Sequence, residues 1–260
     1  MSRNLFVQHG KRPILVCSLT DNTLDELKAT IRNAIYDGAD GFLLHLERLP
    51  LEFRTREVLS QIFSYGEGRP FMTLNYQYDG KMSPDELMAL QLEAIEAGAA
   101  CVDLPADMYG ASKGGYTDEP AAVERQKIFV DKVHALGGQV LSSYHQFEVY
   151  VPSSEILPRA ASMAARNVDF VKIAQHIERE DQLPDAISTT IRLNREMPVP
   201  TLHILFGPIG RAHRAIAPVF GSSMVLCVQR YTPASHKDKP LLRATRDLYD
   251  NLDFEIAPRS

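Results

Sequence analysis

The chain has 260 residues, of which 45% are hydrophobic and 23% are charged, as in an ordinary globular protein. Its formal net charge of −5 argues against a general affinity for nucleic acid or for an anionic membrane, although it is compatible with a local basic pocket. The length suits one large α/β domain or two small ones.

Three cysteines, Cys17, Cys101 and Cys227, lie in separate apolar runs. Their odd number and the lack of a zinc-binding spacing predict reduced, buried thiols in a cytoplasmic protein. The N-terminus opens no hydrophobic stretch of signal-peptide length, and no later apolar run reaches the roughly 18 residues that cross a membrane. We therefore expect a cytoplasmic protein that has no membrane segment and no nucleic-acid partner.

Eight short apolar runs alternate with longer amphipathic runs along the chain. The apolar runs have the length and composition of strands that are buried on both faces. The predicted strands are residues 13–19, 41–46, 70–76, 101–105, 139–145, 169–174, 201–206 and 223–229. The predicted helices are residues 23–37, 53–65, 83–97, 119–135, 153–166, 179–196, 209–219 and 239–252.

This alternation predicts the fold. Short connections between eight βα units make neighbouring strands parallel, and eight such units close into a (β/α)8 barrel, also called a TIM barrel. We expect a single barrel domain over residues 1–260. The alternative is an open doubly wound sheet, which usually carries a glycine-rich phosphate loop after its first strand. Residues 18–22, which follow the first predicted strand here, contain no glycine.

Polar and titratable residues follow the ends of most predicted strands. In such barrels the active site lies at the C-terminal ends of the strands. The residues expected on this face are His45, Glu47, Asn75, Tyr76, Asp79, Asp103, Ser143, Tyr144, His145, Lys172, Gln175, His176, the segment 207–214, Arg230, Thr232 and His236. Of the eight histidines, only His9 and His134 are clearly away from it.

Lys172 lies in the middle of an apolar predicted strand. Strand alternation places it on the face opposite to Val171 and Ile173, whose β-branched side chains suit the helix layer. Lys172 then points into the barrel near its top, where desolvation and neighbouring cations favour the free amine that forms Schiff bases. His145 ends the neighbouring strand and reaches the same pocket as a general acid and base. The structural alternative is a lysine with a buried stem and a solvated head.

Three segments resemble the type I 3-dehydroquinate dehydratases. Residues 143–147 (SYHQF) and 170–174 (FVKIA) are similar to that family's Ser-x-His-Asp-Phe and Val-Lys-Ile-Ala patterns. Residues 207–214 (GPIGRAHR) are similar to its Gly-x-x-Gly-x-x-Ser-Arg stretch. The order and spacing of these segments fit across nearly the whole chain, so the resemblance also implies the barrel fold.

The resemblance implies a lyase that removes water from 3-dehydroquinate, or a related keto compound, through a lysine imine. Lys172 would form the imine, and His145 would remove the neighbouring proton and assist imine formation and release. Arg214 would bind the substrate carboxylate by its guanidinium fork. Asp79 falls where the family has a glutamate that supports the histidine. The family needs no metal or other cofactor, and its members are often homodimers.

Several substrate-binding positions of that family differ here. The residues that stand at them are Leu43 and His45 on the second strand, Asn75 on the third, Pro105 on the fourth, Gln146 on the fifth, and Thr232 and His236 near the C-terminus. Groups that make an imine are kept, whereas groups that bind substrate hydroxyls are changed, and each lost contact costs about 1.5–3 kcal/mol. We therefore expect a different keto acid, or a cyclic ketone with fewer or different hydroxyls.

Other functions stay open at this point. A Schiff-base aldolase uses the same lysine chemistry but cleaves a carbon–carbon bond. A barrel hydrolase or isomerase would bind a metal through a histidine cluster, although no His-x-His or His-Glu-x-x-His spacing occurs. The candidate ligands of that cluster are His45, His145, His176, His203 and His236 with Glu47 or Asp103. A binding protein without catalysis is the third alternative.

Overall fold

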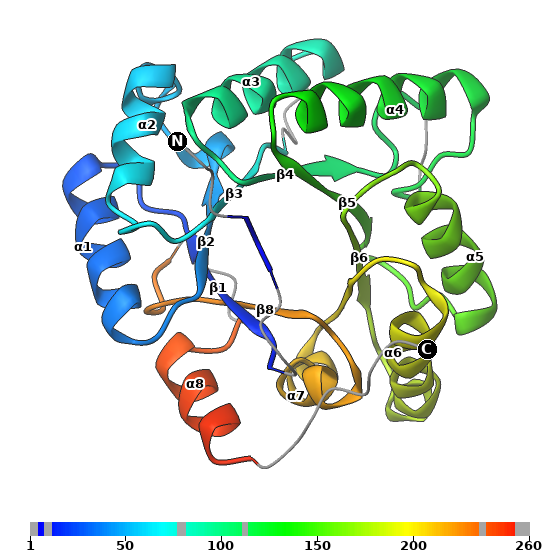
Figure 1. Ribbon diagram of the computed structural model, residues 1–260. Helices are drawn as coiled ribbons and strands as arrows, with labels where there is room; N and C mark the ends of the chain where they lie inside the picture. The colour runs from blue at the N-terminus through cyan, green and yellow to red at the C-terminus, as the bar shows by residue number, and fades with distance from the viewer. Residues whose placement is uncertain (1–4, 8–11, 77–81, 111–113, 234–237, 253–260) are drawn as a thin grey trace.

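The computed structural model describes residues 5–7, 12–76, 82–110, 114–233 and 238–252. Within these ranges, eight strands alternate with eight α-helices, and the strands form one parallel sheet in the order β7-β6-β5-β4-β3-β2-β1-β8. The sheet curls into a barrel, and the helices surround it (Figure 1). The predicted (β/α)8 barrel is therefore confirmed, and the open-sheet alternative is wrong.

The boundaries of the elements agree with the predicted runs to within a few residues. The strands are β1 Ile14–Leu19, β2 Gly41–His45, β3 Phe71–Leu74, β4 Cys101–Pro105, β5 Gln139–Gln146, β6 Phe170–His176, β7 Thr201–Phe206 and β8 Met224–Cys227. The helices are α1 Leu24–Tyr36, α2 Arg56–Ser64, α3 Pro84–Ala97, α4 Pro120–Ala135, α5 Ser153–Ala164, α6 Leu183–Glu196, α7 Pro208–Ile216 and α8 Leu242–Asp250. Four short 3-10 turns lie at Leu46–Arg48, Leu51–Phe53, Glu180–Gln182 and Ala217–Phe220.

The last helix starts later than predicted. The sequence places its start at residue 239, whereas α8 begins at Leu242. The preceding residues run beside the end of β8, where the Val228 N–H donates to the Pro240 carbonyl and the Leu242 N–H donates to the Val228 carbonyl. These backbone bonds hold Pro240 and Leu241 beside Val228 at the rim of the barrel, on the face where the strands end.

The barrel closes at a seam between β7 and β8. At this seam the Ser223 N–H donates to the Thr201 carbonyl at 2.8 Å, and the Ser223 hydroxyl donates to the same carbonyl. On its other side β8 pairs with β1, from Ile14 with Met224 to Cys17 with Cys227. The first and last strands are thus paired with each other, and β8 is joined to a strand on each side.

Two apolar layers form the core, one inside the barrel and one between the strands and the helices. On β6, Phe170 and Ala174 belong to the inner layer, whereas Val171 and Ile173 pack against the helices. The predicted alternation along this strand is therefore confirmed, and Lys172 shares the inner face. The three cysteines are buried and form no disulfide. Among the described residues, no helix combines the length and apolar character needed to cross a membrane.

Two histidines expected on the catalytic face lie in the helix layer instead. His203 alternates with Leu202 and Ile204, which face the barrel interior, so its ring points outward. His203 Nδ1 and His213 Nε2 each lie 2.8 Å from the Thr190 hydroxyl. Burial lowers the pKa of His213 to about 4, and burial with the charge of His213 lowers the pKa of His203 well below its usual value. Both rings are therefore neutral in the folded chain at neutral pH.

This pair predicts a loss of stability in mild acid. The unfolded chain binds protons on these histidines near a pH of about 6.5, whereas the folded chain does not, so stability falls as the pH drops below that value. Each such histidine contributes up to about 1.4 kcal/mol per pH unit. We expect the free energy of unfolding in urea to decrease between pH 7 and 5, and His213→Gln to reduce this slope. The matched control is His134→Gln, because His134 is partly exposed beside Asp169. Equal slopes for His213→Gln and the wild type would contradict the prediction.

Candidate active site

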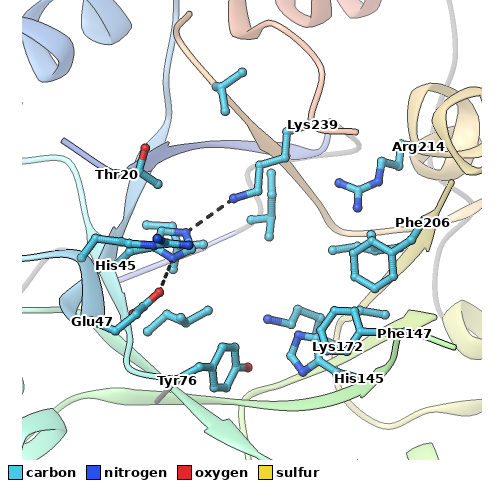
Figure 2. A pocket seen from close by; sticks show the side chains of 17 residues that line it. Thr20, His45, Glu47, Tyr76, His145, Phe147, Lys172, Phe206, Arg214 and Lys239 are labelled. Carbon is cyan, nitrogen blue, oxygen red and sulfur yellow. Dashed lines mark hydrogen bonds and ion pairs between the residues drawn. The ribbon is translucent and has the colours of Figure 1, made fainter. Parts of the chain in front are cut away.

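A pocket opens where the strands end, and its walls combine charged groups with an apolar floor (Figure 2). Its polar lining consists of Thr20, His45, Glu47, Arg48, Tyr76, His145, Lys172, Arg214 and Lys239. Its apolar lining consists of Leu43, Leu74, Phe147, Ala174, Ile204, Phe206, Leu226 and Val228. The pocket therefore lies where the barrel geometry predicts an active site.

Lys172 reaches this pocket from β6 and is 3% exposed. Its ammonium donates to Asp103 Oδ2 at 2.6 Å, while Asp103 Oδ1 accepts from the hydroxyls of Tyr76 at 2.7 Å and Ser143 at 2.5 Å. Lys172 was expected among neighbouring cations, and the structure adds a carboxylate partner, Asp103, which was expected on the same face of the barrel. A buried aspartate at an inward position of the apolar strand β4 was the available signal, because such a charge requires a partner.

His145 lies near the end of β5, where it pairs with Ala174 on β6, two positions beyond Lys172. Its ring stacks on the Phe147 ring, with 5.6 Å between the ring centroids. It also makes a T-shaped contact with the Tyr76 ring, with 5.0 Å between the ring centroids. Burial and the positive charge of Lys172 lower the pKa of His145 well below its usual value. The ring is therefore neutral at neutral pH, which is the form that accepts a proton.

A tight turn after β7 brings Arg214 over the pocket. Gly207 adopts a φ of +92°, and a Cβ at Gly210 would lie 2.6 Å from the Leu205 carbonyl, so α7 packs directly on the strand end. Arg214 Nε donates to the Leu205 carbonyl at 2.9 Å, and the guanidinium lies 5.4 Å from the Phe206 ring centroid. Burial lowers the pKa of Arg214 to about 10, which leaves the group charged at neutral pH and able to bind an anion.

The other predicted site residues have different outcomes. His45 lies in the pocket, with its Nδ1 atom 2.8 Å from Glu47 Oε1. Thr232 lines a small separate cavity with Ser18 and Asp21 rather than the pocket. Asp79 and His236 lie outside the described residues.

Asn75 was predicted to contact the substrate, but it does not line this pocket. Leu74 faces the barrel interior, so the next residue points to the opposite side. Asn75 is 1% exposed and lines a neighbouring cavity with Pro105 and Tyr109. Tyr76, one position later, supplies a polar group to the pocket from the residues that follow β3.

The histidines do not converge on one point. His203 lies in the helix layer with His213, although it was a candidate metal ligand. Among the described residues, no group of three or more His, Cys, Asp or Glu side chains is placed to hold a metal ion. The two pocket histidines, His45 and His145, belong to different walls of the pocket (Figure 2).

One pocket residue was missed by the sequence argument. Lys239 is 9% exposed, lines the pocket, and donates to the Ser18 hydroxyl at 2.7 Å. It was assigned to the predicted last helix, where a lysine is ordinary. Proline commonly occupies the first turn of a helix, so Pro240 was a signal that Lys239 itself lies before the helix.

Comparisons with known proteins identify a family and support the barrel fold. The sequence model of the type I 3-dehydroquinase family matches residues 15–230. Comparison with curated proteins gives no match. Three solved structures of similar chains are those of 3-dehydroquinate dehydratases.

The type I enzyme from Clostridium difficile, determined with covalently modified comenic acid, is 16% identical at a TM-score of 0.81, covering 96% of this chain and 95% of that chain. The protein from Geobacillus kaustophilus is 13% identical at a TM-score of 0.77, and the match covers 92% of this chain and 90% of that chain. The protein from Enterococcus faecalis is 16% identical at a TM-score of 0.76, and the match covers 96% of this chain and 97% of that chain. These likenesses show the fold, and the family model covers most of the sequence. The chain therefore belongs to the type I 3-dehydroquinase family.

Proposed function

We propose that this chain is a Schiff-base-forming carbon–oxygen lyase, which removes water from a keto acid through an imine on Lys172. The observation that carries the proposal is that the Lys172 amine and the His145 ring open into one pocket from neighbouring strands. A nucleophile and a neutral base within reach of one substrate are the minimum that imine-based proton abstraction requires. Family membership supports the same reaction class.

Asp103 supports both stages of imine chemistry. Attack on a ketone requires the neutral amine, and the Asp103 carboxylate, 2.6 Å from the Lys172 nitrogen, is placed to accept the proton that leaves. Once the imine is protonated, the same carboxylate lies beside the new positive charge and stabilises it. The hydroxyls of Tyr76 and Ser143 hold the carboxylate in position throughout.

The proton transfers follow from the position of His145. The protonated imine withdraws electrons from the neighbouring carbon, and the neutral ring accepts the proton from that carbon. The electron pair moves toward the imine nitrogen, and loss of the oxygen on the next carbon gives an unsaturated product. Water then releases this product from Lys172 and restores the amine.

Arg214 and the apolar floor define the substrate class. The buried, charged guanidinium offers a binding site for a carboxylate at the wall formed by α7. The floor consists of Leu43, Leu74 and other apolar side chains, which offer no hydrogen bonds to hydroxyl groups. This combination favours a keto acid that carries fewer hydroxyls than 3-dehydroquinate.

The first prediction of this proposal concerns the imine. Borohydride added to the protein with a panel of keto acids should reduce the imine and leave a stable adduct, which peptide mass mapping should locate on Lys172. Lys172→Met should abolish the adduct, whereas Lys28→Met, on the outer face of α1, should keep it. A wild-type protein that forms no adduct with any keto acid contradicts the proposal, and product analysis separates dehydration from carbon–carbon cleavage.

The second prediction concerns His145. In deuterated water, exchange of the hydrogen next to the ketone should fall about 10²- to 10⁴-fold in His145→Gln, while the Lys172 adduct still forms on longer incubation. Because burial and Lys172 depress the pKa of His145, the acid limb of the wild-type exchange rate should lie below a pH of about 6.5. Nuclear magnetic resonance measures this exchange, and an unchanged rate in His145→Gln assigns the base to another residue.

The third prediction concerns specificity. Loss of two hydroxyl-binding contacts implies a kcat/KM for 3-dehydroquinate at least about a hundredfold below that for the preferred keto acid. Steady-state kinetics over the keto acid panel measures this ratio, with the Enterococcus faecalis 3-dehydroquinate dehydratase as the positive control. Efficient turnover of 3-dehydroquinate by this chain would show that its substrate has not changed.

A further inference from the structure

A second lysine enters the pocket from the wall opposite Lys172. Figure 2 shows Lys239 and Lys172 on opposite sides of the space, with Arg214 to one side. Lys239 Nζ donates to the Ser18 hydroxyl at 2.7 Å and lies 3.5 Å from His45 Nε2. The proposed imine chemistry uses neither Lys239 nor its neighbours Ser18 and His45, so the convergence of these three groups needs another explanation.

Glu47, His45 and Lys239 form a row of neighbouring polar side chains. His45 Nδ1 lies 2.8 Å from Glu47 Oε1, and a carboxylate at this distance favours the tautomer with the proton on Nδ1. His45 Nε2 then presents its lone pair to the Lys239 amine. Burial and the charge of Lys239 lower the pKa of His45, which keeps the ring neutral and able to accept a proton.

The charges around the two lysines differ. Lys172 is paired with the Asp103 carboxylate at 2.6 Å. Lys239 faces the cations Arg214 and Lys172, with Glu47 and the Cys17 thiol as its acidic neighbours. Burial and the two cations lower the pKa of Lys239 to about 7. Its amine is therefore present in both protonation states at neutral pH, which suits proton transfer.

The backbone around Lys239 is held on both sides. Asp238 accepts from the Gly207 N–H at 3.3 Å and from Arg211 Nε at 3.0 Å, which fastens the segment to the turn after β7. The Tyr231 hydroxyl donates to the Lys239 carbonyl at 3.2 Å, and Pro240 is bonded to the end of β8. Such fixed placement is what a proton-transfer group needs.

We propose that Lys239 is a second acid–base group of this site, with His45 and Glu47 as its positioning residues, and that it protonates the oxygen that leaves the substrate. The proposal rests on the lyase function given above. After His145 takes the carbon-bound proton, electrons from the resulting enamine break the carbon–oxygen bond. The oxygen departs with the bonding pair, takes a proton from the Lys239 ammonium, and leaves as water. Lys239 becomes a neutral amine. Before the next turnover, His145 releases its proton to solvent and Lys239 takes up a proton from solvent.

A substrate-free measurement tests the protonation state of Lys239. Trace acetylation with acetic anhydride over a pH series, followed by peptide mass mapping, reports the reactivity of each lysine amine. We expect a labelling midpoint near pH 7 for Lys239. Lys172→Met should raise this midpoint because a cation is removed, and Glu47→Gln should lower it because an anion is removed. A midpoint near pH 10, or no labelling at any pH, overturns the proposal.

Kinetics on the keto acid that labels Lys172 test the role in turnover. Lys239→Met should still form the borohydride adduct on Lys172, with kcat reduced about 10²- to 10⁴-fold and KM changed much less. Because the acid form acts, kcat should fall as the pH rises through the Lys239 midpoint, and Glu47→Gln should move this limb to lower pH. Lys28→Met is the control with unchanged activity.

The outcomes separate the two proposals. An adduct on Lys172 together with an unchanged kcat in Lys239→Met overturns the role of Lys239 and leaves the lyase proposal standing. A wild-type adduct on Lys239 instead of Lys172 assigns it as the nucleophile and overturns the acid–base role. Absence of any Lys172 or Lys239 adduct in the wild type overturns the lyase function, and the role of Lys239 in that reaction with it.

Discussion

The buried ion pair between Lys172 and Asp103 is the interaction on which the site depends. Two opposite charges inside a barrel are costly unless each has a partner and the remaining hydrogen bonds are satisfied. Here the hydroxyls of Tyr76 and Ser143 complete the shell of the carboxylate. The four groups come from β4, β5, β6 and the residues after β3, so one polar network holds four neighbouring strand ends in register.

Lys172, Lys239 and Arg214 are three of the cationic side chains that line this pocket, and their surroundings differ. The Lys172 amine lies against a carboxylate, the Lys239 amine faces other cations, and the Arg214 guanidinium is bonded to a backbone carbonyl. In the proposed reaction these three surroundings suit a carbonyl-reactive group, a proton-transfer group and an anion-binding group, respectively. This division depends on neighbours and burial rather than on residue type.

The sequence predicted those features that local patterns determine. Strand alternation and strand order placed Lys172 and His145 in one pocket, and the resemblance of residues 207–214 to the type I 3-dehydroquinate dehydratases placed Arg214 beside them. Asn75 was assigned to the substrate by resemblance alone, and strand alternation directs it away from the side that Leu74 faces. Lys239 was missed because its contact with Ser18 joins residues 221 positions apart, which only the closed barrel brings together. The Lys172–Asp103 pair, 69 positions apart, depends on closure in the same way.

The seam between β7 and β8 has a consequence for how the molecule acquires activity. Arg214 follows β7, Lys239 follows β8, and the contact of Asp238 with Gly207 and Arg211 spans the gap between them. The anion-binding wall and the second amine therefore meet only when the final strand has docked. Without β8 in place, the pocket lacks the wall that carries Lys239. Local opening at this seam would separate the two walls while the remaining strands stay paired.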